Sequence, residues 1–179
     1  MQTSINKTVL SAILIALCVA MGYLFLYVPN VEMITASVFL AGAIMGPGYG
    51  LLIGIISETM FSVFNPYGMP IPTMLAAQVA VFGLIGATGG LLRKNMIDRR
   101  MRFVCCALAG LTLTLIYDML TTLSFSLTLA DVNLQKLTGI FASGMLFSAI
   151  HIGVNVLIFT LIVPVLYSRL QPHLPGYVR

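Results

Sequence analysis

Five polar side chains that can donate, accept or titrate stand inside long apolar stretches: Glu58, Gln78, Asp118, His151 and Asn155. Such groups are costly within a membrane and are usually functional there. His151 and Asn155 are one helical turn apart and therefore share a face. Carboxylates accept hydrogen bonds, whereas imidazole and amide groups can both donate and accept. We therefore expect a polar pocket for a ligand with nitrogen donors or positive charge.

A proline-rich loop, residues 65–72, follows Glu58 closely in the sequence. Its prolines fix φ at three places, and Asn65 and Tyr67 stand at its start. We expect these two side chains to cap the pocket, with the loop as a lid on its outer side. Thr122 lies one turn after Asp118, and its hydroxyl faces either the pocket or a backbone carbonyl. In the alternative interpretation, the polar groups form separate interhelix hydrogen bonds of about 1 kcal/mol each.

Aromatic side chains accompany these polar groups, and they either stack on a planar ligand or pack in the core and against lipid. They are Phe61, Phe64, Tyr117, Phe125 and Phe147.

The composition indicates what positions these side chains. Hydrophobic residues make up 59% of the 179 residues and charged residues only 8%, against about 25% charged in soluble domains. About 20 apolar residues span a bilayer core. We predict an all-α integral membrane protein with six transmembrane helices in a single domain, residues 1–179. The predicted helices are residues 8–28, 32–45, 49–64, 73–92, 103–127 and 137–167.

The positive charges predict the orientation. With six spans, Lys136 falls on one side, and the other eight of the nine Lys and Arg residues fall on the opposite side. Positive charges favour cytoplasmic loops, so both termini are expected in the cytoplasm of a multi-pass plasma membrane protein of prokaryotic type. The basic residues 93–102 are too few to indicate nucleic acid. They indicate a topology determinant and a contact for anionic membrane lipid.

The sequence lacks the short motifs that mark several classes of enzyme and metal site. The sequence has no His-Glu-x-x-His, Gly-x-Ser-x-Gly or Walker pattern. Its three cysteines lie in apolar runs without Cys-x-x-Cys spacing, which indicates buried thiols. We therefore predict no enzyme activity, no catalytic residue, no cofactor and no metal site.

Small residues recur at every fourth position in three segments. Such stripes let helix backbones approach closely in lipid. Two glycine series indicate internal packing or, at Pro47, a turn. The alanine stripe in the first helix packs internally or forms a surface for a partner membrane protein. The stripes are Ala12, Ala16 and Ala20; Gly42, Gly46, Gly50 and Gly54; and Gly86 and Gly90.

These features together resemble the substrate-binding S components of energy-coupling factor (ECF) vitamin transporters. The size, the six spans and the alanine stripe are similar, as are residues 41–50 (AGAIMGPGYG) and 65–68 (NPYG). The resemblance implies high-affinity binding of a vitamin or related small-molecule nutrient near the outer side. It also implies docking through Ala12, Ala16 and Ala20 onto a transmembrane coupling subunit that works with two cytoplasmic ATPases. The subunit would then topple in the membrane to release substrate inside, with residues 65–72 as the gate.

The substrate contacts come from the residues and not from a family motif: Glu58, Asn65, Tyr67, Gln78, Asp118, Thr122, His151 and Asn155. Nickel and cobalt members start with Met-His, whereas Gln2 follows Met1 here, which argues against a metal substrate. Two alternatives stay open. One is a self-contained permease or channel that uses Glu58, Asp118 and His151 as an ion path. The other is a membrane enzyme or assembly factor that holds a lipid.

Overall fold

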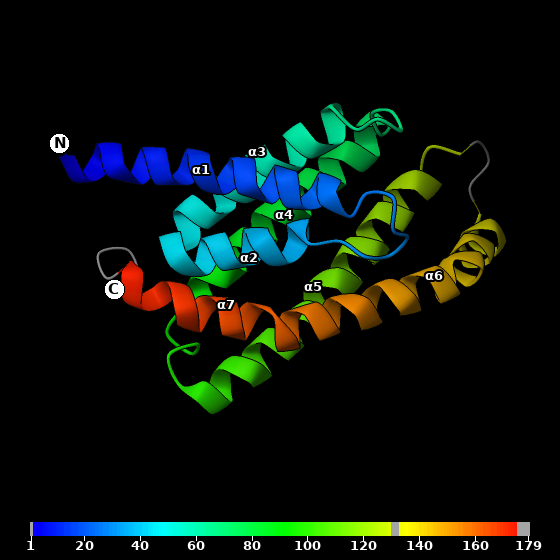
Figure 1. Ribbon diagram of the computed structural model, residues 1–179. Helices are drawn as coiled ribbons and strands as arrows, with labels where there is room; N and C mark the ends of the chain where they lie inside the picture. Colours follow the sequence, from blue (N-terminus) through cyan, green and yellow to red (C-terminus); the bar gives the residue numbers. More distant parts are fainter. Residues whose placement is uncertain (1, 130–132, 175–179) are drawn as a thin grey trace.

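The computed structural model describes residues 2–129 and 133–174, with side chains from residue 7 onward (Figure 1). Helices are the regular elements of these residues, which confirms the all-α prediction. They are α1 (Gln2–Leu24), α2 (Ile34–Met45), α3 (Pro47–Val63), α4 (Pro72–Leu92), α5 (Arg99–Ser126), α6 (Leu134–Leu161), α7 (Val163–Leu170) and the 3₁₀ helix η1 (Gln171–His173).

Four apolar segments in the described residues are long enough to cross a bilayer core of about 30 Å. They are Lys7–Leu24, Pro72–Leu92, Arg99–Ser126 and Leu134–His173. The chain is therefore a helical membrane protein. Two further helices are shorter: α2 has 12 residues and α3 has 17. The count of six spans stays a prediction.

Helices α1 to α6 run alternately between two ends of the bundle, and α7 continues in the direction of α6 (Figure 1). The start of α1, the end of α7 and the α4–α5 connection lie at one end, and the α1–α2 and α3–α4 connections lie at the other. The basic residues at the start of α5 are therefore at the same end as the start of α1 and the end of α7. The orientation of this end in the membrane stays a prediction.

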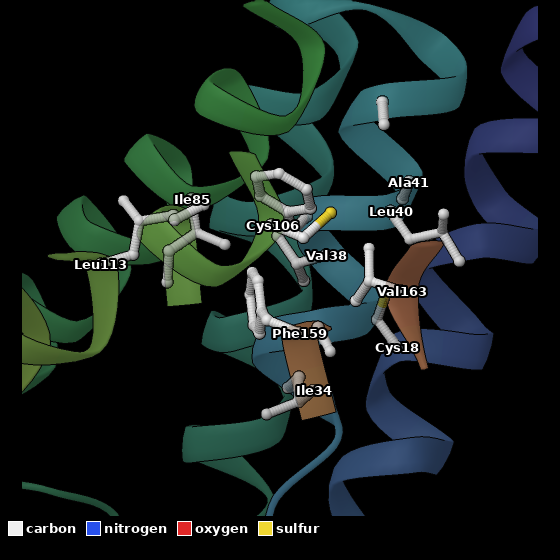
Figure 2. Close-up of a cluster of buried hydrophobic side chains, with 14 of the residues drawn as sticks. Cys18, Ile34, Val38, Leu40, Ala41, Ile85, Cys106, Leu113, Phe159 and Val163 are labelled. Atoms are coloured by element: carbon white, nitrogen blue, oxygen red, sulfur yellow. The ribbon is translucent and has the colours of Figure 1, made fainter. Parts of the chain in front are cut away.

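Helix α2 is the central element. Its sequence, ITASVFLAGAIM, is apolar around the whole helix, which is typical of a buried helix. Every α2 residue except Ser37 is buried, and the helix packs against α1, α3, α4, α6 and α7. Figure 2 shows Val38 of α2 gathered with Cys106 of α5 and Phe159 of α6. A helix enclosed by others does not need the length of a lipid-facing span.

Glycine permits the close packing of α2, α3 and α4. A Cβ on Gly86 would lie 2.0 Å from the carbonyl oxygen of Gly50, and one on Gly42 would lie 1.9 Å from that of Gly86. A Cβ on Gly54 would lie 2.0 Å from the carbonyl oxygen of Phe82. The backbones of these helices are therefore in direct contact, so this glycine series serves internal packing.

Turns fall close to the predicted glycine and proline positions. Gly46 has a φ of +93°, which favours glycine, and it separates α2 from α3. Pro164 lies in the first turn of α7, where a missing N–H costs little. The sequence predicts a helix over residues 137–167 that Pro164 kinks or ends, and the chain breaks close to that position, at Ile162, into α6 and α7.

The first connection is longer than expected. Helix α1 ends at Leu24 and α2 begins at Ile34, so the predicted bounds at residues 28 and 32 were wrong. The intervening residues 25–33, here named the first connection, include Glu32. Several of them face a cavity.

Candidate functional site

A cavity of about 630 Å³ lies between the first connection, α5 and α6. Figure 1 shows these segments meeting at the end of the bundle opposite the termini. The C-terminal half of α5 and the N-terminal half of α6 form its side walls. The polar residues that line it are Asn30, Glu32, Tyr117, Asp118, Thr121, Thr122, Ser143, Ser148 and His151.

Two carboxylates from different elements face the imidazole of His151. Its Nδ1 is 2.8 Å from Oδ1 of Asp118 on α5, and its Nε2 is 3.5 Å from Oε1 of Glu32. The same Glu32 oxygen accepts hydrogen bonds from Asn155 Nδ2, at 3.4 Å, and from the Thr35 hydroxyl. Glu32 therefore ties the first connection to both α6 and α2.

Aromatic rings form much of the remaining wall. Phe61, Tyr117, Phe125 and Phe147, four of the five aromatics singled out in the sequence, line the cavity, and Phe25 joins them. The fifth, Phe64, is 72% exposed outside it. A cavity with rings on several sides and a cluster of polar groups can hold a planar ligand that also makes hydrogen bonds.

The comparison with known families agrees with this geometry. A sequence profile described as "ECF-type riboflavin transporter, S component" matches residues 2–171. The chain belongs to this family. S components are substrate-binding subunits of transporters and are not enzymes. No curated protein and no solved structure matches the chain.

The predicted site residues of this S component fall into two groups around the cavity. Asp118, Thr122 and His151 line it. Gln78 and Asn155 lie behind the wall and contact lining residues: Gln78 donates to the hydroxyl of Tyr117 at 3.1 Å, and Asn155 donates to Glu32.

Three other predicted residues, all in the described part of the chain, are not among the lining residues. Glu58 is 1% exposed and accepts a 2.8 Å hydrogen bond from Ser62 on its own helix. Asn65 accepts from the backbone N–H of Tyr67 at 3.0 Å and so stabilises its own turn. Tyr67 is 71% exposed, and the centroid of its ring lies 6.1 Å from that of Tyr27 in an edge-on arrangement.

Glu32 is the residue that the sequence interpretation missed. The expected helix over residues 32–45 placed it at a helix start, where an acid is common for reasons of helix dipole alone. Its position two residues after the Pro29–Asn30 turn was the one indication that it could belong to the site. An acid in an irregular segment is free to point toward a neighbouring helix.

The alanine stripe lies on the outer surface of this S component. Ala12, Ala16 and Ala20 are exposed on α1, whereas Cys18 on the opposite face is buried. Helix α1 packs only one side against α2 and α3, within the described residues. The structure therefore leaves this face open to lipid or to a partner.

Proposed function

We propose that this S component binds riboflavin, or a related vitamin with a planar ring system, in the cavity and serves its uptake by an ECF-type ABC transporter. The cavity carries the proposal. Its volume of about 630 Å³ falls within the range of roughly 300–1,000 Å³ that is usual for small-molecule sites. Five aromatic rings and the Glu32–His151–Asp118 cluster line it. Family membership supports a flavin as the first ligand to test.

Ligand binding is tested on gently purified protein in detergent. Native mass spectrometry should detect a copurified compound of vitamin size, and added riboflavin should lose fluorescence on binding with a Kd below about 1 µM, or about −8 kcal/mol. Heat-denatured protein is the control. Protein without bound compound and without fluorescence change would contradict the proposal, and a bound lipid would favour the lipid-binding alternative.

Transport additionally requires partners, which we propose to be a transmembrane coupling subunit and two cytoplasmic ATPases. The exposed stripe of Ala12, Ala16 and Ala20 is the proposed contact with the coupling subunit. Alanine at one-turn intervals leaves no side chain beyond Cβ, so a partner helix can approach the α1 backbone closely.

The docking contact is tested by Ala16→Trp. A large ring should hold the partner away, so cellular uptake and copurification of the coupling subunit should be lost while riboflavin binding is retained. Leu108→Trp is the matched control, since Leu108 is 56% exposed on α5 outside the stripe. Unchanged uptake with Ala16→Trp would contradict docking through this face.

We further propose that six spans place both termini in the cytoplasm and the cavity on the outer side. In a variant whose native cysteines are replaced by serine, His173→Cys and Thr128→Cys mark the two ends of the bundle. A membrane-impermeant maleimide added to intact cells should label position 128 and not position 173. The reverse pattern would contradict the orientation.

A further inference from the structure

The Glu32–His151–Asp118 cluster combines two acids with one imidazole. Both ring nitrogens of His151 face carboxylate oxygens, at 2.8 Å and 3.5 Å. The imidazolium donates at both nitrogens, whereas the neutral ring keeps one nitrogen as an acceptor. The geometry thus suits a charged ring between two carboxylates, which leaves the cluster with one net negative charge.

Four polar oxygens of the cavity wall can only accept hydrogen bonds from a ligand. Oδ2 of Asp118 and Oδ1 of Asn30 are buried and have no hydrogen-bond partner, and the Asp118 residue is only 8% exposed. The hydroxyls of Thr121 and Ser143 donate to backbone carbonyls of their own helices, so their oxygens can only accept from a ligand. Tyr117, which accepts from Gln78, keeps its proton for donation.

Lysine and arginine are missing from the described residues of this wall, and its one imidazolium, His151, already faces two carboxylates. Lysine and arginine are the side chains that normally bind phosphate. The N-terminus of α2 lies beside the cavity and would favour an anion through its dipole. Its neighbour Glu32 already supplies a carboxylate there and is bonded to Thr35 in the first turn of the helix.

We propose that Glu32 and Asp118 are specificity-determining residues that admit a neutral or cationic, donor-bearing vitamin and reject its phosphate ester. This inference rests on the proposed function, because it assumes that the vitamin binds in this cavity. A donor on the ligand satisfies Oδ2 of Asp118. A phosphate, with a charge of about −1.5 to −2 at pH 7, would instead lose its water in a wall of net negative charge, whose imidazolium is already paired with Glu32 and Asp118.

The test compares each vitamin with its own phosphate ester, so that the ring system is held constant. Riboflavin is paired with riboflavin 5′-phosphate, and thiamin with thiamin monophosphate, in equilibrium binding to the purified chain. For the vitamin that binds, the wild-type protein should prefer the unphosphorylated form by about 100-fold or more.

Neutral variants of the same shape assign the preference to residues. Glu32→Gln and Asp118→Asn should each reduce the preference by about tenfold, mainly through tighter binding of the ester. Asp98→Asn is the matched control, because Asp98 caps α5 at the opposite end of the bundle and asparagine caps a helix equally well. Its preference should equal that of wild type. Glu32 lies outside the helices, so its variant stays informative if Asp118→Asn folds poorly.

The outcomes separate this inference from the proposed function. Equal binding of riboflavin and its phosphate overturns the inference and leaves the function standing. A large preference that neither variant reduces also overturns the inference, since shape alone would then explain it. If the flavins do not bind and thiamin binds with the predicted preference, the flavin assignment fails and the inference stands. If none of the four compounds binds, both fail.

Discussion

Two halves of this S component use glycine in opposite ways. In α2, α3 and α4, glycines let the backbones touch, and an added Cβ would overlap a carbonyl oxygen at about 2 Å. In α6, an added Cβ on Gly139, Gly144 or Gly153 would meet no atom within 4 Å. The backbones of the first half are therefore in direct contact, whereas these three glycines of α6 face away from neighbouring helices; at Gly110 of α5, an added Cβ would lie 2.7 Å from Cβ of Phe159.

The cavity lies on the loosely packed side. Most residues of α6 before His151 are exposed, and α6 makes its main contacts with α5. Side-chain hydrogen bonds through Glu32 supplement this sparse packing by joining α6 to the first connection. We therefore expect α2, α3 and α4 to stay fixed, while the proposed ligand enters and leaves on the side of α6.

The largest effect should come from adding a methyl group to the rigid half. Gly86→Ala places a Cβ against the carbonyl of Gly50, so α3 and α4 must separate. We expect a loss of about 3 kcal/mol in stability. Thermal unfolding can be followed with a thiol-reactive dye, because Cys18 and Cys106 are buried until the protein unfolds.

Gly153→Ala is the matched control in the other half. Its Cβ meets nothing within 4 Å, and alanine favours a helix over glycine by about 1 kcal/mol. Its stability should therefore equal or exceed that of wild type. Equal losses in both variants would show that the two halves are packed alike.

The next largest effect should come from His151→Ala. Without the imidazole, Asp118 and Glu32 lose their shared donor and repel each other across the cavity. We expect riboflavin affinity to fall by about 100-fold, or about 2.7 kcal/mol, in a fluorescence titration.

The other histidine of the chain serves as the control for this change. His173 is exposed in η1 at the end of the bundle opposite the cavity, so His173→Ala should bind as wild type does. Retained affinity in His151→Ala would show that the cluster has only a structural role.

Hydrogen exchange tests the comparison without a mutation. Backbone amides of the first connection and of the α6 segment that lines the cavity, residues 140–151, should exchange faster than those of α2, because these segments are less buried. Saturating riboflavin should slow exchange in these two segments by about tenfold or more and leave α2 unchanged. Uniform protection across α2 and α6 would contradict a division into rigid and mobile halves.

The sequence predicted the elements better than their contacts. Hydropathy and the breaks at Gly46–Pro47 and Pro72 located the helices, since these depend on local composition and backbone geometry. His151 and Asn155 were assigned to one face from their spacing. Their pairing with Asp118 and Glu32 depends on the rotation and register of separate helices, which periodicity does not specify. Glu32 lies in a connection without any periodicity, so its position after the Pro29–Asn30 turn was the only indication and did not specify which helix it contacts.

The smallest effect should come from Glu58→Gln, which tests how far the site extends. The sequence assigns Glu58 to substrate binding, whereas the structure encloses it within the rigid half, bonded to Ser62 and with its second carboxylate oxygen unpartnered. Glutamine keeps the acceptor for Ser62 and cannot ionise. We expect riboflavin affinity to change by less than about threefold, or roughly 0.7 kcal/mol, with no loss of thermal stability. A tenfold loss of affinity in a stable variant would instead show that the ligand reaches into the glycine-packed half, and the division between the two halves would fail at α3.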